Sequence, residues 1–235
     1  MEMIIPGVYT FTGLMVGRVY LLEDPDGLTI IDAGLGFAAA RILKQLRQKG
    51  HSPQDVKRLL VTHAHPDHIG GLRALQQATG AAVIASAVEQ PYIEGTKPVP
   101  RAPKSDLTGG SRLMYGQATL VDQPVPVNHT LQDGEIMAEV LNGLQAVYTP
   151  GHSPGHTSYW HPEKGILFSG DVIMRMTGNL SLPIAAFTPS MDENKRSIRR
   201  VIALEPRIVC FGHGQPMREN TTATIRQFAQ KVGAI

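Results

Sequence analysis

Residues 63–68 read His63-Ala64-His65-Pro66-Asp67-His68, which places four metal-ligand side chains within six positions. Three imidazoles this close together would repel one another if protonated, and they would make a poor apolar core. Divalent metal ions remove both problems, because neutral imidazole and ionised carboxylate are the forms that bind zinc-class ions. In an extended loop the first two histidines point the same way, whereas the aspartate and the last histidine can turn towards a second position. The spacing therefore favours two adjacent metal ions over one tetrahedral ion.

The segments on either side of this stretch are a predicted strand and a predicted helix. Residues 58–62 form a branched, apolar run of the kind found in strands, and residues 69–78 have helical character. A lone histidine is an ordinary core or surface residue far more often than a metal ligand. A cluster of four ligand side chains between a strand and a helix is a much more specific pattern, and we interpret it as a metal site.

The composition is that of an ordinary globular protein. Of the 235 residues, 42% are hydrophobic and 18% are charged, which leaves ample material for a core. The formal net charge of +2 is too small to indicate a nucleic-acid or anionic membrane partner. No signal-peptide pattern is seen, and no apolar run approaches the roughly 20 residues that a membrane helix needs. Cys210 is the single cysteine and cannot form an internal disulfide, so we expect a cytoplasmic location.

The rest of the chain alternates predicted strands with predicted helices. Strands are expected at 8–12, 19–22, 28–31, 58–61, 81–85, 134–140, 144–148, 157–160, 166–168 and 208–211, and helices at 37–49, 69–78, 190–204 and 220–232. Between them, residues 86–130 hold six prolines and a Gly-Gly pair, so no regular element is expected there. The two halves share one layout and one chemistry. We therefore expect a single α/β domain over residues 1–235, with an irregular loop insertion at about 86–130.

Three further candidate ligands each follow a predicted strand and a glycine. They are His152, Asp171 and His213. Glycine lets the backbone come close to an ion or to a neighbouring loop, because it has no Cβ. Together with the first cluster this makes five histidines and two aspartates at the ends of four strands. Such a set fits a metal site at a common edge between two sheets.

These motifs together resemble those of the metallo-β-lactamase superfamily. The matching stretches are Thr62 to His68, Gly151-His152, Ser169-Gly170-Asp171 and Gly212-His213-Gly214, with Ile31-Asp32-Ala33-Gly34 as the early element beneath the site. The resemblance covers nearly the whole chain. It implies a four-layer αββα sandwich, in which helices flank two packed sheets and the site lies along one edge.

The resemblance also implies a role for each matching position. The first metal would be held by His63, His65 and His152, the second by Asp67, His68 and His213, and Asp171 would bridge both. Two divalent ions are thus expected, zinc above all, although iron or manganese suits the same nitrogen and oxygen ligands. Asp32 and His156 are expected one layer further out, where hydrogen bonds would hold the ligand loops.

The carboxylate at position 171 points to one branch of the superfamily. Better-known true β-lactamases have cysteine or serine there, so Asp171 resembles the branch of glyoxalase II, lactonases and general ester or thioester hydrolases. Glyoxalase II enzymes carry an additional C-terminal helical region, whereas only one helix is expected after His213. Many acyl-homoserine lactonases have tyrosine three residues after the bridging aspartate, where this chain has Met174. Neither specialised activity is therefore favoured.

The expected reaction is hydrolysis of an ester, thioester or lactone by a hydroxide that bridges two metals. Two ions about 3.5–4 Å apart lower the pKa of a shared water towards neutrality, and Asp67 would orient this nucleophile and shuttle its proton. A mononuclear iron persulfide dioxygenase-like enzyme is one alternative, because that branch shares the His-x-His-x-Asp-His run. A superfamily nuclease is another, disfavoured by the near-neutral charge. A non-enzymatic binding module is disfavoured because all seven ligand positions are filled.

Two irregular segments, 86–130 and 172–189, are the only ones long enough to wall a cleft over the metals. We expect Tyr115, Met174, Met176 and Phe187 to contact the substrate, which makes the cleft partly apolar and adaptable. The substrate should then be a small molecule with an uncharged acyl chain or an aromatic ester. No nucleic-acid or membrane partner is expected, and a homodimer is left open.

Overall fold

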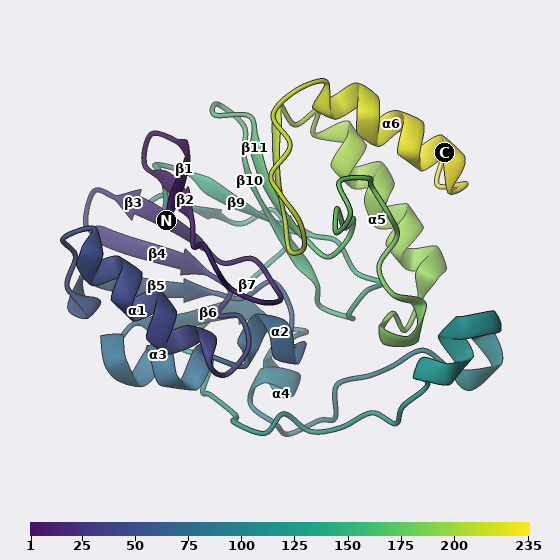
Figure 1. Cartoon of the computed structure of the whole chain (residues 1–235), viewed down its shortest axis with the longest axis horizontal. Coiled ribbons are helices and arrows are strands. Elements are labelled where there is room, and N and C mark those ends of the chain that lie inside the picture. Colours follow the sequence, from purple (N-terminus) through teal and green to yellow (C-terminus); the bar gives the residue numbers. More distant parts are fainter.

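The computed structural model describes residues 1–235, and its strands belong to two β-sheets (Figure 1). The strands are β1 (Glu2–Ile5), β2 (Val8–Thr10), β3 (Tyr20–Asp24), β4 (Gly27–Ile31), β5 (Val56–Leu60), β6 (Ala82–Ser86), β7 (His129–Leu131), β8 (Ile136–Met137), β9 (Leu144–Tyr148), β10 (Thr157–His161), β11 (Ile166–Gly170) and β12 (Ile208–Phe211). Strands β1 to β7 form a seven-stranded sheet in chain order, and the five-stranded sheet has the order β12-β11-β10-β9-β8. Strands β4 to β7 are parallel, so their carboxyl ends lie at one edge.

Helices cover the outer face of each sheet. They are α1 (Ala38–Gln48), α2 (Pro66–Ile69), α3 (Leu72–Thr79), α4 (Gln90–Ile93), α5 (Met191–Ala203) and α6 (Thr221–Lys231), with 3₁₀ turns η1 (Pro53–Asp55), η2 (Lys104–Asp106), η3 (Gly109–Met114) and η4 (Ala185–Phe187). Figure 1 shows α1 and α3 outside the first sheet and α5 and α6 outside the second. None of the helices is long and apolar enough to cross a membrane.

Three apolar clusters separate these four layers. Ile30 and Leu59 lie in the cluster that packs α1 and α3 on the first sheet, whereas their neighbours Ile31 and Leu60 lie in the cluster between the sheets. This alternation arises because a strand points successive side chains to opposite faces. A third cluster packs α5 and α6 on the outer face of the second sheet. The predicted αββα sandwich is therefore confirmed.

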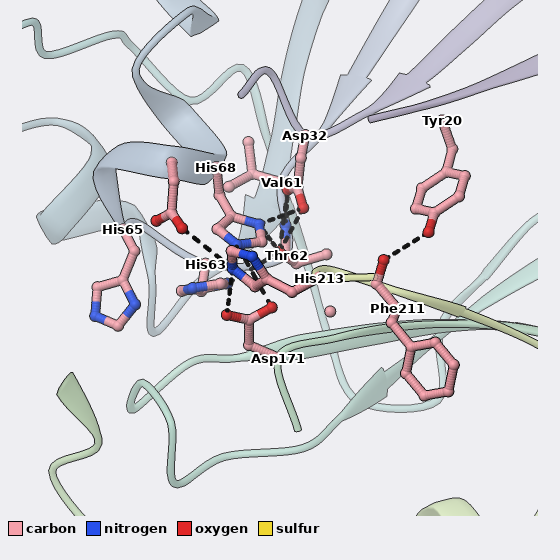
Figure 2. Close-up of polar contacts among 12 residues, drawn as sticks. Tyr20, Asp32, Val61, Thr62, His63, His65, His68, Asp171, Phe211 and His213 are labelled. Atoms are coloured by element: carbon pink, nitrogen blue, oxygen red, sulfur yellow. Dashed lines mark hydrogen bonds and ion pairs between the residues drawn. The ribbon is translucent and has the colours of Figure 1, made fainter. Parts of the chain in front are cut away.

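Two buried tyrosines join the sheets close to the predicted metal ligands. The hydroxyl of Tyr20 on β3 donates a hydrogen bond to the carbonyl oxygen of Phe211 at 2.5 Å, as Figure 2 shows. The hydroxyl of Tyr159 on β10 donates to the carbonyl oxygen of Val61 at 2.7 Å. Each acceptor lies two residues before a predicted ligand, so the bonds tie the end of each ligand-bearing strand to the opposite sheet.

The predicted helix at 69–78 is divided in the structure into α2 and α3, and this is a correction. The break falls where the loop after β4 passes against the helix. The Gly71 N–H donates to the carbonyl oxygen of Gly34 at 3.0 Å, and a Cβ on Gly71 would lie 2.5 Å from the carbonyl oxygen of Ala33. This close approach of two backbones interrupts the helix and brings Asp32 beside α2.

Two further sequence predictions differ from the structure. The strand predicted at 134–140 is reduced to the two residues of β8. A turn at Gly134, with a φ of 84°, precedes β8, and the chain turns again after it, towards Leu141 and Asn142 with φ angles of 50° and 64°. The segment 86–130 contains α4, η2 and η3, and β7 begins at its end and extends the first sheet. That residues 1–235 form a single domain with an insertion there stays a prediction.

Candidate metal centre

The seven predicted ligands meet at one edge of the sandwich. The first sheet supplies four of them, from the loop after β5 and from α2, and the second sheet supplies three, from the loops after β9, β11 and β12. Since these three strands run in the same direction, their carboxyl ends reach the same edge. The side chains brought together are His63, His65, Asp67, His68, His152, Asp171 and His213.

Their ligand atoms form three overlapping groups, each with all atoms within 4.8 Å of one another. The groups are His63, His65 and His152; His63, His68 and Asp171; and Asp67, His68 and His213. The first and last are the ligand sets that the superfamily resemblance implies for two separate ions. Oδ2 of Asp171 lies 3.4 Å from Nε2 of His152 and 3.1 Å from Nε2 of His213, one histidine from each set. Figure 2 shows Asp171 facing His68 and His213.

The polar atoms at the centre fit a divalent ion better than they fit one another. Nε2 of His63, Nε2 of His65 and Oδ1 of Asp171 are buried without a hydrogen-bond partner. Each such atom costs about 1–3 kcal/mol if it stays unpaired. Imidazole nitrogen and carboxylate oxygen are the donor atoms that zinc-class ions bind. The residues present therefore fit a divalent metal site.

Burial and charge divide the histidines into two kinds. Burial lowers the pKa of His65 to about 4 and holds the pKa values of His63 and His152 well below the ordinary range, so these rings are neutral. Burial also disfavours charge on His213, but the Asp171 carboxylate outweighs it and raises the pKa to about 9. Metal binding at His213 would therefore release a proton, and such binding should weaken at low pH.

Asp32 orients His68 and the loop that carries the other ligands. Its Oδ1 accepts a hydrogen bond from the Thr62 N–H at 2.9 Å, and its Oδ2 lies 2.7 Å from Nδ1 of His68 (Figure 2). Nε2 of His68 is thereby left to face His213 and Asp171, at 3.4 and 3.5 Å. Asp32 has a φ of 62°, which aspartate tolerates better than most residues. Carboxylates in this position set the tautomer and orientation of metal-binding imidazoles.

His156 supports the backbone at Asp171 and has no nitrogen free for a metal. Its Nε2 accepts a hydrogen bond from the Asp171 N–H at 2.9 Å, and its Nδ1 lies 2.8 Å from Oγ1 of Thr149. Burial lowers the pKa of this ring to about 3, so it stays neutral. The structure thus places His156 beside the ligands, in contact with the chain that carries one of them.

Glu89 also contacts the ligand loops, and sequence reasoning missed it. Its buried carboxylate accepts hydrogen bonds from the N–H groups of Ala64 and Gly155, both at 2.8 Å, and from the Ser153 hydroxyl at 3.1 Å. Ala64 lies between two ligands of the first set, and Ser153 follows the third, so one carboxylate joins both loops. Its position three residues after β6 could have drawn notice, because β5 and β6 end at the same edge.

A cavity of about 360 Å³ opens onto the metal ligands. Met174, Met176 and Phe187 line it, three of the four residues expected to contact a substrate. The fourth, Tyr115, does not: it follows η3, is 42% exposed and lies against the Lys104 ammonium group. Tyr115 is thus outside the cavity lining, and the structure does not bring it to the site.

An αββα sandwich with five histidines and two aspartates gathered at one sheet edge is the architecture of a metal-dependent hydrolase. The chain belongs to the metallo-β-lactamase superfamily, whose family model matches residues 12–213. The matched range contains all seven predicted ligands, and the resemblance inferred from the motifs is confirmed.

Individual known proteins are similar to this chain over most of its length. The probable metallo-hydrolase YflN of Bacillus subtilis (strain 168) is 27% identical over 247 residues, covering 97% of this chain and 92% of the relative. A hydroxyacylglutathione hydrolase of Cereibacter sphaeroides is 27% identical over 201 residues, covering 82% of this chain and 63% of the relative. A solved metallo-β-lactamase of Cronobacter sakazakii has 26% identity and a TM-score of 0.69, covering 98% of this chain and 82% of that one.

Proposed function

We propose that the protein is a binuclear metal-dependent hydrolase that cleaves an ester, thioester or lactone bond. The observation that carries the proposal is the position of Asp171, whose Oδ2 lies 3.4 Å from His152 and 3.1 Å from His213. These histidines belong to different ligand sets, and a carboxylate between two sets suits a pair of adjacent ions. Zinc is the expected metal, and iron or manganese is compatible with the same ligands.

The side chains around the cavity have separate parts in the proposed reaction. Two divalent ions held by the ligand sets would supply a water of lowered pKa and a polarised carbonyl oxygen. Asp67 lines the cavity and its side chain is 26% exposed, so its carboxylate can take the proton of the attacking water and pass it to the leaving group. Met174 and Phe187 provide an apolar wall for the acyl part of the substrate.

A thioester is one substrate class that the name of a relative supports. One similar protein is named a hydroxyacylglutathione hydrolase, and it aligns with 82% of this chain. In the proposed reaction water adds to the carbonyl carbon, the carbon–sulfur or carbon–oxygen bond breaks, and the proton ends on the leaving group. The side chain of Asp67 faces the same cavity as Asp171, where this transfer would occur.

The experiment that tests the proposal combines metal analysis with a substrate panel. Purified protein should contain two metal ions per chain and should hydrolyse at least one class among thioesters, lactones and aryl esters. One iron per chain with oxygen consumption on a persulfide would instead support the dioxygenase-like alternative. Salt-dependent RNA binding with strand cleavage would support the nuclease. Two bound metals with no hydrolysis of any panel member would overturn the proposal.

A cytoplasmic location, the absence of a nucleic-acid partner and a homodimer are not needed for this reaction. The small formal charge of +2 supports the second of these. The first two stay predictions, and a homodimer stays open.

A further inference from the structure

One arginine, Arg101, lines the cavity above the metal ligands, and no other arginine and no lysine does. Its guanidinium carbon lies 4.4 Å from the centre of the Phe187 ring, which lines the same cavity. A guanidinium stacked on an aromatic face is held in one plane while its N–H groups stay available to an anion. Apart from the histidines, the positive charge of this cavity therefore comes from one positioned side chain.

Arg101 has no acidic partner within the chain. Arg58, Arg200 and Arg218 each form an ion pair with an aspartate or a glutamate, whereas no carboxylate lies at such a distance from Arg101. The side chain is also half-buried. A partly desolvated guanidinium without a counter-charge favours an anion supplied from outside the chain.

The chain on both sides of Arg101 is anchored. Ala102 is buried in a small apolar cluster with Leu107 and with Ala186 of η4. Two residues before Arg101, the Val99 N–H donates to the carbonyl oxygen of Thr119 at 2.8 Å. The segment that carries Arg101 is thus packed on η4, the turn that carries Phe187. The guanidinium is therefore held in place as part of the cavity wall.

Arg101 lies at the boundary between two cavities. A second cavity of about 280 Å³ shares Leu35, His65, Pro66 and Arg101 with the cavity over the metal ligands. Asp122 lines the second cavity but not the first, and its charge disfavours an anion deeper in the second one. Two carboxylates, Asp67 and Asp171, also line the first cavity, but both belong to the predicted ligand set, and bound metal would offset their charge. With metal bound, the favourable place for an anion is therefore beside Arg101 on the side of the predicted ligands.

We propose that Arg101 binds an anionic group of the substrate, a carboxylate or a phosphate, while the scissile carbonyl lies over the metal ligands. The inference rests on the proposed hydrolase function and narrows its substrates to acidic esters or thioesters. This departs from the uncharged substrate expected from the sequence, since the sequence did not show that Arg101 faces the cavity. The apolar side chains then contact the carbon chain between the carbonyl and the anion.

The test uses metal-loaded protein and matched thioesters that differ only in charge. Pentanoyl, glutaryl and 4-phosphonobutanoyl thioesters of one thiol place a methyl, a carboxylate or a phosphonate, which stands in for a phosphate, at the same reach. Acetyl thioesters of 3-mercaptopropionate and of its methyl ester vary the charge on the leaving group. Wild-type protein should prefer the anionic member of at least one series at least tenfold in kcat/KM. The better of the two anionic acyl groups identifies the anion.

Arg101→Gln should lower that preference about 10–100-fold, the loss expected for a charge-assisted hydrogen bond. Arg101→Lys should lower it less, because the charge stays but the planar fork is lost. Lys104→Ala is the matched control, since this cation lies nearby without lining the cavity, and it should leave the preference within about twofold. No preference in wild-type protein, or a preference that survives Arg101→Gln, would overturn the inference.

A binding measurement separates this inference from the hydrolase proposal. If no thioester is cleaved, the hydrolase proposal fails, and calorimetric titration of glutaramate against pentanamide still tests Arg101, because these two amides differ only in a carboxylate against a methyl group. Glutaramate should bind wild-type protein at least tenfold more tightly than pentanamide, and Arg101→Gln should remove that difference. Equal binding of both amides to wild-type protein would show that Arg101 does not recognise an anion.

Discussion

The carboxylate of Asp171 contacts histidines of both ligand sets, among them His152 and His213. Asp171→Ala should therefore lower the metal content below two ions per chain and reduce activity more than about 100-fold. This loss exceeds the roughly 10–100-fold that is typical when a residue that hydrogen-bonds to a metal ligand is replaced.

Asp32 acts through Thr62 and His68, so Asp32→Ala should reduce activity about 10–100-fold and should lower the metal content less than Asp171→Ala does. Metal analysis beside kinetics checks both, and an Asp171→Ala protein with two metals and near-normal turnover would refute the bridging role.

Glu89 is expected to make the stability of the folded protein depend on pH. Burial raises its pKa from 4.5 to about 7, although Ala64, Ser153 and Gly155 donate hydrogen bonds to it. The folded protein thus holds this proton more tightly than the unfolded chain, and the stabilisation present below pH 4.5 is lost as the pH rises through about 7.

Glu89→Gln removes this titration. Between these pH values the free energy of unfolding of wild-type protein should fall relative to the variant, by up to about 1.4 kcal/mol per pH unit. Urea denaturation in a chelator across the pH range measures the difference. Glu219→Gln, at an exposed position, is the control. A difference between wild type and Glu89→Gln that is constant with pH would contradict the prediction.

At the scale of elements, the break between α2 and α3 depends on the contact with the loop after β4. A Cβ on Gly71 would lie 2.5 Å from the carbonyl oxygen of Ala33, whereas a Cβ on Gly36 would meet its nearest atom, the Gly70 carbonyl oxygen, at 3.6 Å. Gly71→Ala should therefore destabilise the fold by about 1–3 kcal/mol, the usual effect of overpacking. Gly36→Ala should change stability by less than about 0.5 kcal/mol. Chemical denaturation of both variants checks this, and equal effects would contradict it.

The segment 172–189 supplies Met174, Met176, Ile184 and Phe187 to the cavity wall. Burying a methylene group contributes about 0.8 kcal/mol before losses, which corresponds to up to about fourfold in kcat/KM for each added carbon. Activity should thus rise from acetyl to octanoyl esters until the cavity is filled. Phe187→Ala should flatten the rise. A response that is already flat in wild-type protein, or a strict requirement for glutathione, would count against this wall.

At the scale of the whole molecule, the predicted metal ligands come from both sheets. Four of them come from the first sheet's side and three from the second, so bound metal should stabilise the packed sandwich. A ligand at 100 times its dissociation constant adds about 2.7 kcal/mol to the free energy of unfolding. Adding a chelator should lower the melting temperature, and zinc should restore it. His152→Ala should shrink this shift, and a melting temperature indifferent to metal would contradict the prediction.

The sequence by itself predicted the four layers, through the family resemblance, and the candidate ligands. Within the layers, strand alternation places Ile30 and Ile31 in different apolar clusters, and that signal is contained within a few neighbouring residues. The candidate ligands were equally readable, because metal chemistry selects few residue types and the family motifs hold them at strand ends. Such patterns can be read without the tertiary structure, because each depends only on residues that are close together in the chain.

Only the tertiary structure decided which other residues surround the predicted ligands and the cavity. Glu89 reaches a loop 66 residues away at Gly155, and Arg101 meets Phe187 from another segment of the chain. Tyr115 is apolar enough to line a cleft, yet it lies against Lys104 and is not part of the cavity lining. The physical reason is that such contacts depend on how two sheets and their loops pack, and nothing within a few residues of Glu89, Arg101 or Tyr115 encodes that packing.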